Sequence, residues 1–131
     1  FSLETQAVYK ALSVRDPEPD CAAVEALSTT PVQTLLEVVE QASQPPWAGM
    51  RAATCLIVGH GAELAPTLES WVQGPESRGL ALLVLDQLDS LPEAQALDLA
   101  QKALAGPHAA DAPSRLARSQ RPAIVALVPS P

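Results

Sequence analysis

Apolar residues recur at helical spacing along most of this chain, and prolines and glycines separate one recurrence from the next. Within residues 31–88 the pattern occurs twice. The first copy begins at Thr30, a residue type that favours helix N-caps, with Pro31 at the first helical position. The apolar residues that share one face of this predicted helix are Val32, Leu35, Leu36 and Val39.

A second helix is predicted after Gln44-Pro45-Pro46, over residues 47–58. Gly59-His60-Gly61 should end it, because such residues tolerate left-handed backbone geometry. In the second copy, the apolar positions with helical spacing are Leu64, Leu68, Trp71 and Val72. Gly74-Pro75 then breaks the chain, and another helix is predicted from about Ser77 to Leu88.

A third copy is predicted to begin at Ser90, with Ser90 as N-cap and Glu93 completing a capping box. Gly106-Pro107 should stop its first helix. The apolar positions expected on that helix are Ala96, Leu97, Ala100, Ala103 and Leu104. Alternating helices separated by Pro or Gly at this period are typical of helical repeat proteins.

The arrangement resembles HEAT-type repeats over residues 30–106. The resemblance rests on Pro31 with Leu35 and Leu36 in the first helix, and on Arg51-Ala52-Ala53 in the second. It implies that small residues let neighbouring second helices pack closely. Arg78 lies at a similar place 27 residues later, but Gly79-Leu80 follows it. The expected fold is an all-α, right-handed α-solenoid of three to four helical hairpins, with an irregular helical bundle as the alternative.

One domain is expected over residues 1–131, in three parts. Residues 1–29 should form an N-terminal helical hairpin, with Ser2 and Asp20 as N-caps and apolar stripes that include Leu3, Cys21 and Leu27. Residues 30–106 hold the repeats. Residues 107–131 form a basic and apolar C-terminal segment, in which residues 123–128 fit either a last core helix or an extended segment lying in a groove.

Composition limits the possible functions. The chain is 47% hydrophobic and has a formal net charge of −7, which disfavours binding to nucleic-acid phosphates. No apolar run approaches the length of a membrane span. Cys21 and Cys55 lack metal-ligand spacing, and buried free thiols are favoured over a disulfide. The compartment is left open, with the cytoplasm slightly favoured.

Candidate chemistry is sparse in this sequence. His60 and His108, the two histidines, are interpreted as residues of helix ends. No catalytic motif, metal-ligand pattern or cofactor motif is found, so neither a cofactor nor enzyme activity is expected. The start at Phe1 predicts a fragment or a processed product, and a structural fragment of a larger scaffold is one alternative function. A HEAT-like enzyme acting on a modified base or a pigment is the other.

The preferred function is protein–protein interaction as a scaffold or adaptor, because stacked hairpins create long, shallow surfaces. Tryptophan and arginine are enriched in interface hot spots. The chain up to Asp111 carries a formal charge of −10, whereas three arginines and no acid follow it. These arginines are expected to rest on the acidic body or to cap a helix end, with an anionic partner site as the alternative. The candidate partner-binding residues are Trp47, Arg51, Arg78, Arg115, Arg118 and Arg121.

Overall fold

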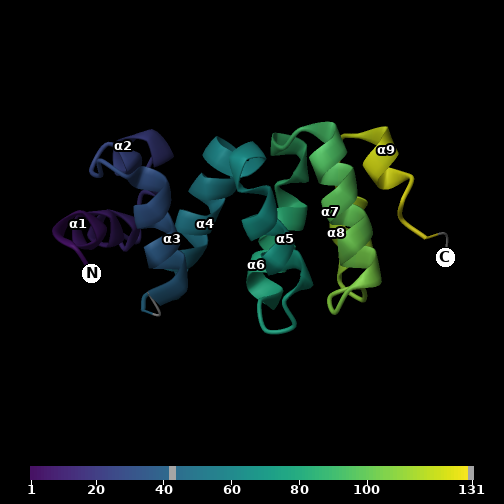
Figure 1. Ribbon diagram of the computed structural model, residues 1–131, viewed down its shortest axis with the longest axis horizontal. Helices are drawn as coiled ribbons and strands as arrows, with labels where there is room; N and C mark the ends of the chain where they lie inside the picture. Colours follow the sequence, from purple (N-terminus) through teal and green to yellow (C-terminus); the bar gives the residue numbers. More distant parts are fainter. Residues whose placement is uncertain (42–43, 130–131) are drawn as a thin grey trace. The chain divides into compact units, whose positions relative to one another are not determined.

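The computed structural model describes residues 1–41 and 44–129, and within these ranges the chain forms helices and no strand (Figure 1). The all-α prediction is therefore confirmed. The chain clusters into two compact units, Phe1–Leu56 (unit 1) and the residues from Ile57 onward (unit 2). This division lies inside one helix and not at the predicted boundaries after residues 29 and 106. A single-domain organisation stays a prediction.

Unit 1 is built from helices whose first residues carry the predicted signals. Ser2 caps the first helix by accepting a hydrogen bond from the Thr5 amide at 3.1 Å, and Asp20 caps the second by accepting one from the Ala23 amide at 3.3 Å. The third helix begins at Pro31, as predicted. The helices are α1 (Leu3–Leu12), α2 (Cys21–Glu25), α3 (Pro31–Gln41) and α4 (Pro46–His60), of which α4 continues into unit 2.

The core of unit 1 forms where α1 packs against α2 and α3. A polar contact joins α1 to α3 inside this packing, since the Thr5 hydroxyl donates to the Glu37 carboxylate at 2.6 Å. Leu3 and Leu27 were expected on apolar faces and are exposed instead, because Leu3 is the first residue of α1 and Leu27 lies beyond the end of α2. The largest buried side chains of unit 1 are Val8, Leu12, Val24, Leu35 and Leu56.

Unit 2 contains two helical hairpins, α5–α6 and α7–α8, and a final short helix, α9. Within it α5 packs against α6 and α7, while α6 also packs against α8. First helices of the two hairpins thus contact each other, and so do the second helices. The elements are η1 (Gly61–Leu64), α5 (Ala65–Gln73), α6 (Arg78–Asp86), η2 (Leu88–Ser90), α7 (Glu93–Ala105), α8 (Ala112–Leu116) and α9 (Pro122–Val125).

Gly61 ends α4 for a different reason from the predicted one. No described residue has a positive φ, so no left-handed geometry occurs at this helix end. A Cβ on Gly61 would lie 2.2 Å from Cδ2 of Leu91, which is buried. Glycine at this position leaves room for the Leu91 side chain to approach the backbone, and the chain then continues directly into η1.

The N-terminus of α7 also differs from its prediction. Ser90 is not the N-cap, because Pro92 occupies that position and Ser90 belongs to η2. The buried Leu91 separates the two, in extended backbone. On α7 itself Leu99 is buried, while Leu97 and Leu104 are half-buried.

The open question of residues 123–128 is answered by α9, a helix of one turn. Ile124 is fully buried, and α9 packs against α7. This short apolar run is therefore the last core element of unit 2.

Candidate protein-binding surface

Trp47 lies in the first turn of α4 and is 37% exposed. Its indole Nε1 donates a hydrogen bond to the carbonyl of Ser13 at 3.2 Å. Ser13 is the C-cap residue of α1, so its carbonyl follows the last helical turn. The polar edge of the ring is thus fixed within unit 1, while part of the ring stays accessible to a partner.

Arg51 lies one helical turn after Trp47 and holds the same segment of chain. Its guanidinium donates to the carbonyls of Leu12 at 3.0 Å, of Val14, and of Arg15 at 3.1 Å. These carbonyls lie at and just beyond the end of α1, where a cation is favourable. A partner contact by Arg51 stays a prediction, but in this structure the guanidinium fastens the α1–α2 loop to α4.

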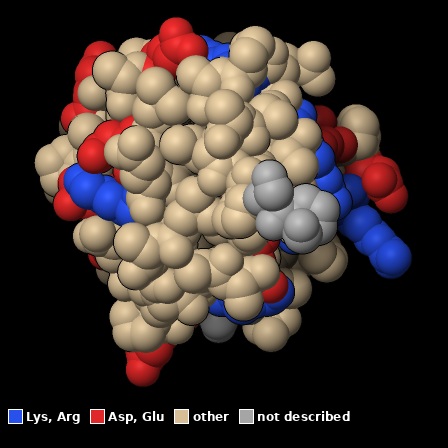
Figure 2. Space-filling model, turned by 90° about the vertical axis from the view of Figure 1, so that its right-hand side faces the viewer, with Lys and Arg blue, Asp and Glu red and all other residues tan. Residues whose placement is uncertain are grey.

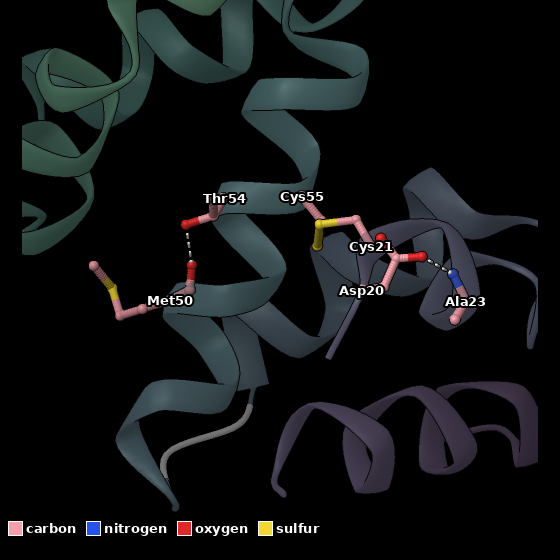
Figure 3. The surroundings of a disulfide bond; sticks show 6 residues. All are labelled: Asp20, Cys21, Ala23, Met50, Thr54 and Cys55. Carbon is pink, nitrogen blue, oxygen red and sulfur yellow. Dashed lines mark hydrogen bonds between the residues drawn. A yellow bond between two sulfur atoms is a disulfide. The ribbon is translucent and has the colours of Figure 1, made fainter. Parts of the chain in front are cut away.

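Three exposed apolar residues belong to the two segments that these hydrogen bonds connect, and we call them the Trp47 patch: Val14, Trp47 and Met50. Val14 is 47% exposed and Met50 is 36% exposed. Figure 3 shows Met50 and Thr54 on one side of α4 and Cys55 on the other, toward α2. The Thr54 hydroxyl donates to the Met50 carbonyl at 2.9 Å, so it adds no unsatisfied donor to this side of the helix.

The sequence analysis named Trp47 but missed Val14 and Met50. Met50 could have been found, because it lies three positions after Trp47, which places both on one helix face. Val14 belongs to a loop, and its position depends on the contacts of Arg51. No local sequence signal reports such contacts.

Cys21 and Cys55 form a disulfide with a Cα–Cα distance of 5.5 Å (Figure 3). The favoured interpretation of free thiols is therefore wrong, and the alternative holds. The bond joins the first residue of α2 to α4 on the side away from Met50. Disulfides persist in oxidising compartments and are rare where thiols are kept reduced.

Arg78, at the start of α6, pairs with Asp111 in unit 2. Its Nε lies 2.9 Å from Oδ2 of Asp111, and the hydrogen bond and positive charge of Arg78 lower the pKa of that carboxyl. Arg51 instead reaches backbone carbonyls from the second turn of its helix. The two arginines therefore do not make corresponding contacts, although the sequence placed them at like positions.

The C-terminal arginines differ among themselves. Arg115 pairs with Asp86 at 2.5 Å, and Arg121 donates to the carbonyls of Leu88 and Asp89 at the end of η2. For these two, the expectation of contacts with the acidic body and with a helix end is confirmed. Arg118 is exposed and, within residues 1–41 and 44–129, its guanidinium has no ion pair or hydrogen bond, so the expectation does not hold for it.

Arg118 lines a hollow of about 250 Å³ between the ends of α6 and α8. The charged residues that line the hollow are two acids and two arginines, which gives the hollow no net preference for a ligand of one sign. The residues lining the hollow are Leu85, Asp86, Asp89, Arg115, Arg118 and Ser119.

On the face at the α9 end, Figure 2 shows charged side chains mainly around the margin and uncharged residues in the middle.

Asp89 fastens the chain after α8 and should make stability depend on acid pH. Hydrogen bonds from the Gln120 amide at 2.8 Å and the Ser119 hydroxyl at 2.5 Å lower the pKa of Asp89 below its ordinary value of 3.8. The contribution of Asp89 to stability is therefore complete above its ordinary pKa of 3.8, and it is lost as the pH falls through the lower pKa of the folded protein.

We expect Asp89→Asn to reduce the free energy of unfolding by about 1 kcal/mol at pH 7, because an exposed carboxylate gives up charge-assisted hydrogen bonds. The reduction should shrink at a pH below the folded pKa, where the wild-type carboxyl is itself protonated. Urea denaturation followed by circular dichroism at both pH values measures it. Equal losses at the two pH values would contradict this role of the ionised carboxylate.

Trp71 and His108 have structural positions in unit 2. Trp71 is buried, as its place on the predicted apolar helix face indicated. His108 is buried in the turn before α8, and its Nε2 lies 2.7 Å from the carbonyl of Gly74, the C-cap residue of α5. The tautomer with hydrogen on Nε2 donates to this carbonyl. His108 thus stabilises a helix end, as the sequence suggested for both histidines.

Metal clusters and membrane-spanning helices are absent from residues 1–41 and 44–129. No cluster of three or more His, Cys, Asp or Glu side chains could hold a metal ion. None of the helices there has the length and apolar character that a membrane crossing requires. The exposed apolar surface of unit 1 is therefore the candidate on which a function can be built.

Comparisons of the chain with protein-family models, with curated proteins and with solved structures find no match.

Proposed function

We propose that this chain is a non-catalytic protein-binding module, built of stacked helical hairpins, whose partner docks on the Trp47 patch of unit 1. The observation that carries the proposal is the exposed Trp47 beside exposed Met50 and Val14. Tryptophan dominates many interface hot spots, because it offers a large apolar surface with few rotatable bonds. A scaffold or adaptor role follows from such a surface.

The packing within each unit supports stacked hairpins of the α-solenoid kind. In unit 1, α1 packs on α3 and the disulfide joins α2 to α4. In unit 2, α5 packs on α7 and α6 on α8. First helices contact first helices, and second helices contact second helices, which is the neighbour pattern of helical solenoids.

A recurring contact supports the same arrangement. Trp47 donates to the carbonyl of Ser13, and the His108 ring lies against the carbonyl of Gly74. Each pair is separated by 34 residues, and each acceptor is the C-cap of the first helix of a hairpin. The same spacing at corresponding places of the two units favours a repeated arrangement, including the proposed HEAT-like relationship.

The test is affinity capture of partners from the native extract on immobilised wild-type and variant protein. We expect Trp47→Ala to weaken the specific partner about tenfold or more, as loss of a hot spot does. Met50→Ser should weaken it as well. Met50 makes no side-chain hydrogen bond, so this second variant separates lost binding from lost anchoring of the α1–α2 loop.

Leu3→Ser is the matched control, because Leu3 is an exposed apolar residue of unit 1 outside the Trp47 patch. Circular dichroism melts should show that all variants fold. Retention of every partner by both Trp47→Ala and Met50→Ser would refute the proposed surface.

A further inference from the structure

An acidic loop borders the Trp47 patch. Residues 15–20 follow Val14 directly and contain one arginine and three acids, a formal charge of −2. Asp16 and Glu18 are exposed, and within the described part of the chain their carboxylates have no hydrogen bond or ion pair. Asp20 caps α2. Two carboxylates are thus available to an approaching molecule.

This loop is fixed at the edge of the patch. The carbonyls of Ser13, Val14 and Arg15 all accept hydrogen bonds from side chains of α4. The disulfide fastens the other end of the loop, since Cys21 is the first residue of α2. Both ends of the loop are therefore fastened to α4, and Asp16 is two residues from Val14 of the patch, so a partner can contact loop and patch together with little loss of loop entropy.

We propose that the Trp47 patch binds a partner segment that presents apolar side chains together with lysine or arginine, such as one face of a basic amphipathic helix. The inference rests on the proposed function and names the chemical class of its partner. Apolar side chains would cover Trp47 and Met50, while basic side chains would face Asp16 and Glu18. Complementary charge at the rim speeds association and excludes acidic competitors.

Two other occupants fit the charges less well. A second copy of this chain also carries a net charge of −7, so the two copies would repel each other over long range. An anionic membrane surface would be repelled by the same loop. The basic segment is favoured because it alone pairs with the loop and covers the apolar residues.

The probe is a fluorescein-labelled amphipathic peptide of leucine and lysine, compared by anisotropy with a leucine–glutamate peptide of the same spacing. Wild-type protein should bind the lysine peptide and not the glutamate peptide. Asp16→Asn with Glu18→Gln should weaken binding about three- to tenfold at low salt and less at high salt, because exposed charges are screened. Trp47→Ala should weaken it under both conditions.

The matched control is Glu63→Gln with Glu76→Gln, which removes the same charge from exposed positions of unit 2. It should leave binding within about twofold. The inference would be overturned by an equal effect of this control or by binding of the glutamate peptide. It would also be overturned by self-association that Trp47→Ala abolishes, or by attachment of the protein to phosphatidylserine vesicles.

The two proposals fail in different ways. If the captured partner depends on Trp47 but not on Asp16 and Glu18, and the lysine peptide does not bind, the docking surface stands and the basic partner class is wrong. If neither partner binding nor peptide binding depends on Trp47, the proposed docking surface is wrong as well.

Discussion

Removal of the disulfide, by Cys21→Ser with Cys55→Ala, should lower the free energy of unfolding of unit 1 by about 3–4 kcal/mol. The bond closes a loop across a sequence separation of 34 residues. A crosslink of that span lowers the conformational entropy of the unfolded chain, and this loss is worth roughly the stated free energy. The α2 helix should be affected most, because it has five residues and Val24 as its buried side chain.

The measurement is urea denaturation of protein labelled with 5-fluorotryptophan. The chain contains two tryptophans, Trp47 in unit 1 and Trp71 in unit 2, so ¹⁹F NMR reports on each unit separately. Wild-type protein treated with a reductant should resemble the double variant, which serves as a control for the substitutions. Unchanged denaturation of unit 1 after reduction would contradict a stabilising disulfide.

Leu35→Asp should unfold unit 1, whereas Leu36→Asp should cost about 1 kcal/mol. Leu35 is fully buried on α3, and Leu36 next to it is half-buried. A carboxylate at Leu35 would be buried without a partner, at a cost of about 3 kcal/mol or more, whereas at Leu36 it can reach water.

The apolar pattern of the sequence does not distinguish Leu36 or Leu83 from the core residues beside them. Leu83 is also half-buried, between the buried Leu82 and Val84 of α6. Circular dichroism melts of both α3 variants test the assignment with the same chemical change at adjacent positions. Equal melting temperatures for Leu35→Asp and Leu36→Asp would show that the two faces of α3 are not distinguished by burial.

The sequence predicted those features of the fold that depend on neighbouring residues. Ser2 and Asp20 act as N-caps, and Pro31 begins α3, because each of these signals works within one helical turn. Ser90 failed as a cap because burial of Leu91 fixes the chain there. The role of Gly61 was also missed, since Leu91 lies 30 residues away in the sequence.

The candidate site was predicted in part. Trp47 could be named from its residue type, but its exposure depends on how α4 packs. Arg51 was expected as a partner contact. Its actual acceptors are backbone carbonyls, which any residue could supply, so the sequence carried no sign of them. The pairing of Cys21 with Cys55 likewise depends on the distance between α2 and α4.

The Cys21–Cys55 bond also sets how far the molecule can be stretched. When a protein is pulled by its two ends, force passes through the shortest covalent path, which here crosses the sulfur atoms. The chain between the two cysteines then carries no tension and, fully extended, would add about 110 Å of contour length. Oxidised protein would therefore shield α3 and the first half of α4 from mechanical unfolding. If the module acts as a link between tethered partners, Trp47 and Met50 of the patch lie inside the stretch that this bond protects, whereas Val14 lies outside it.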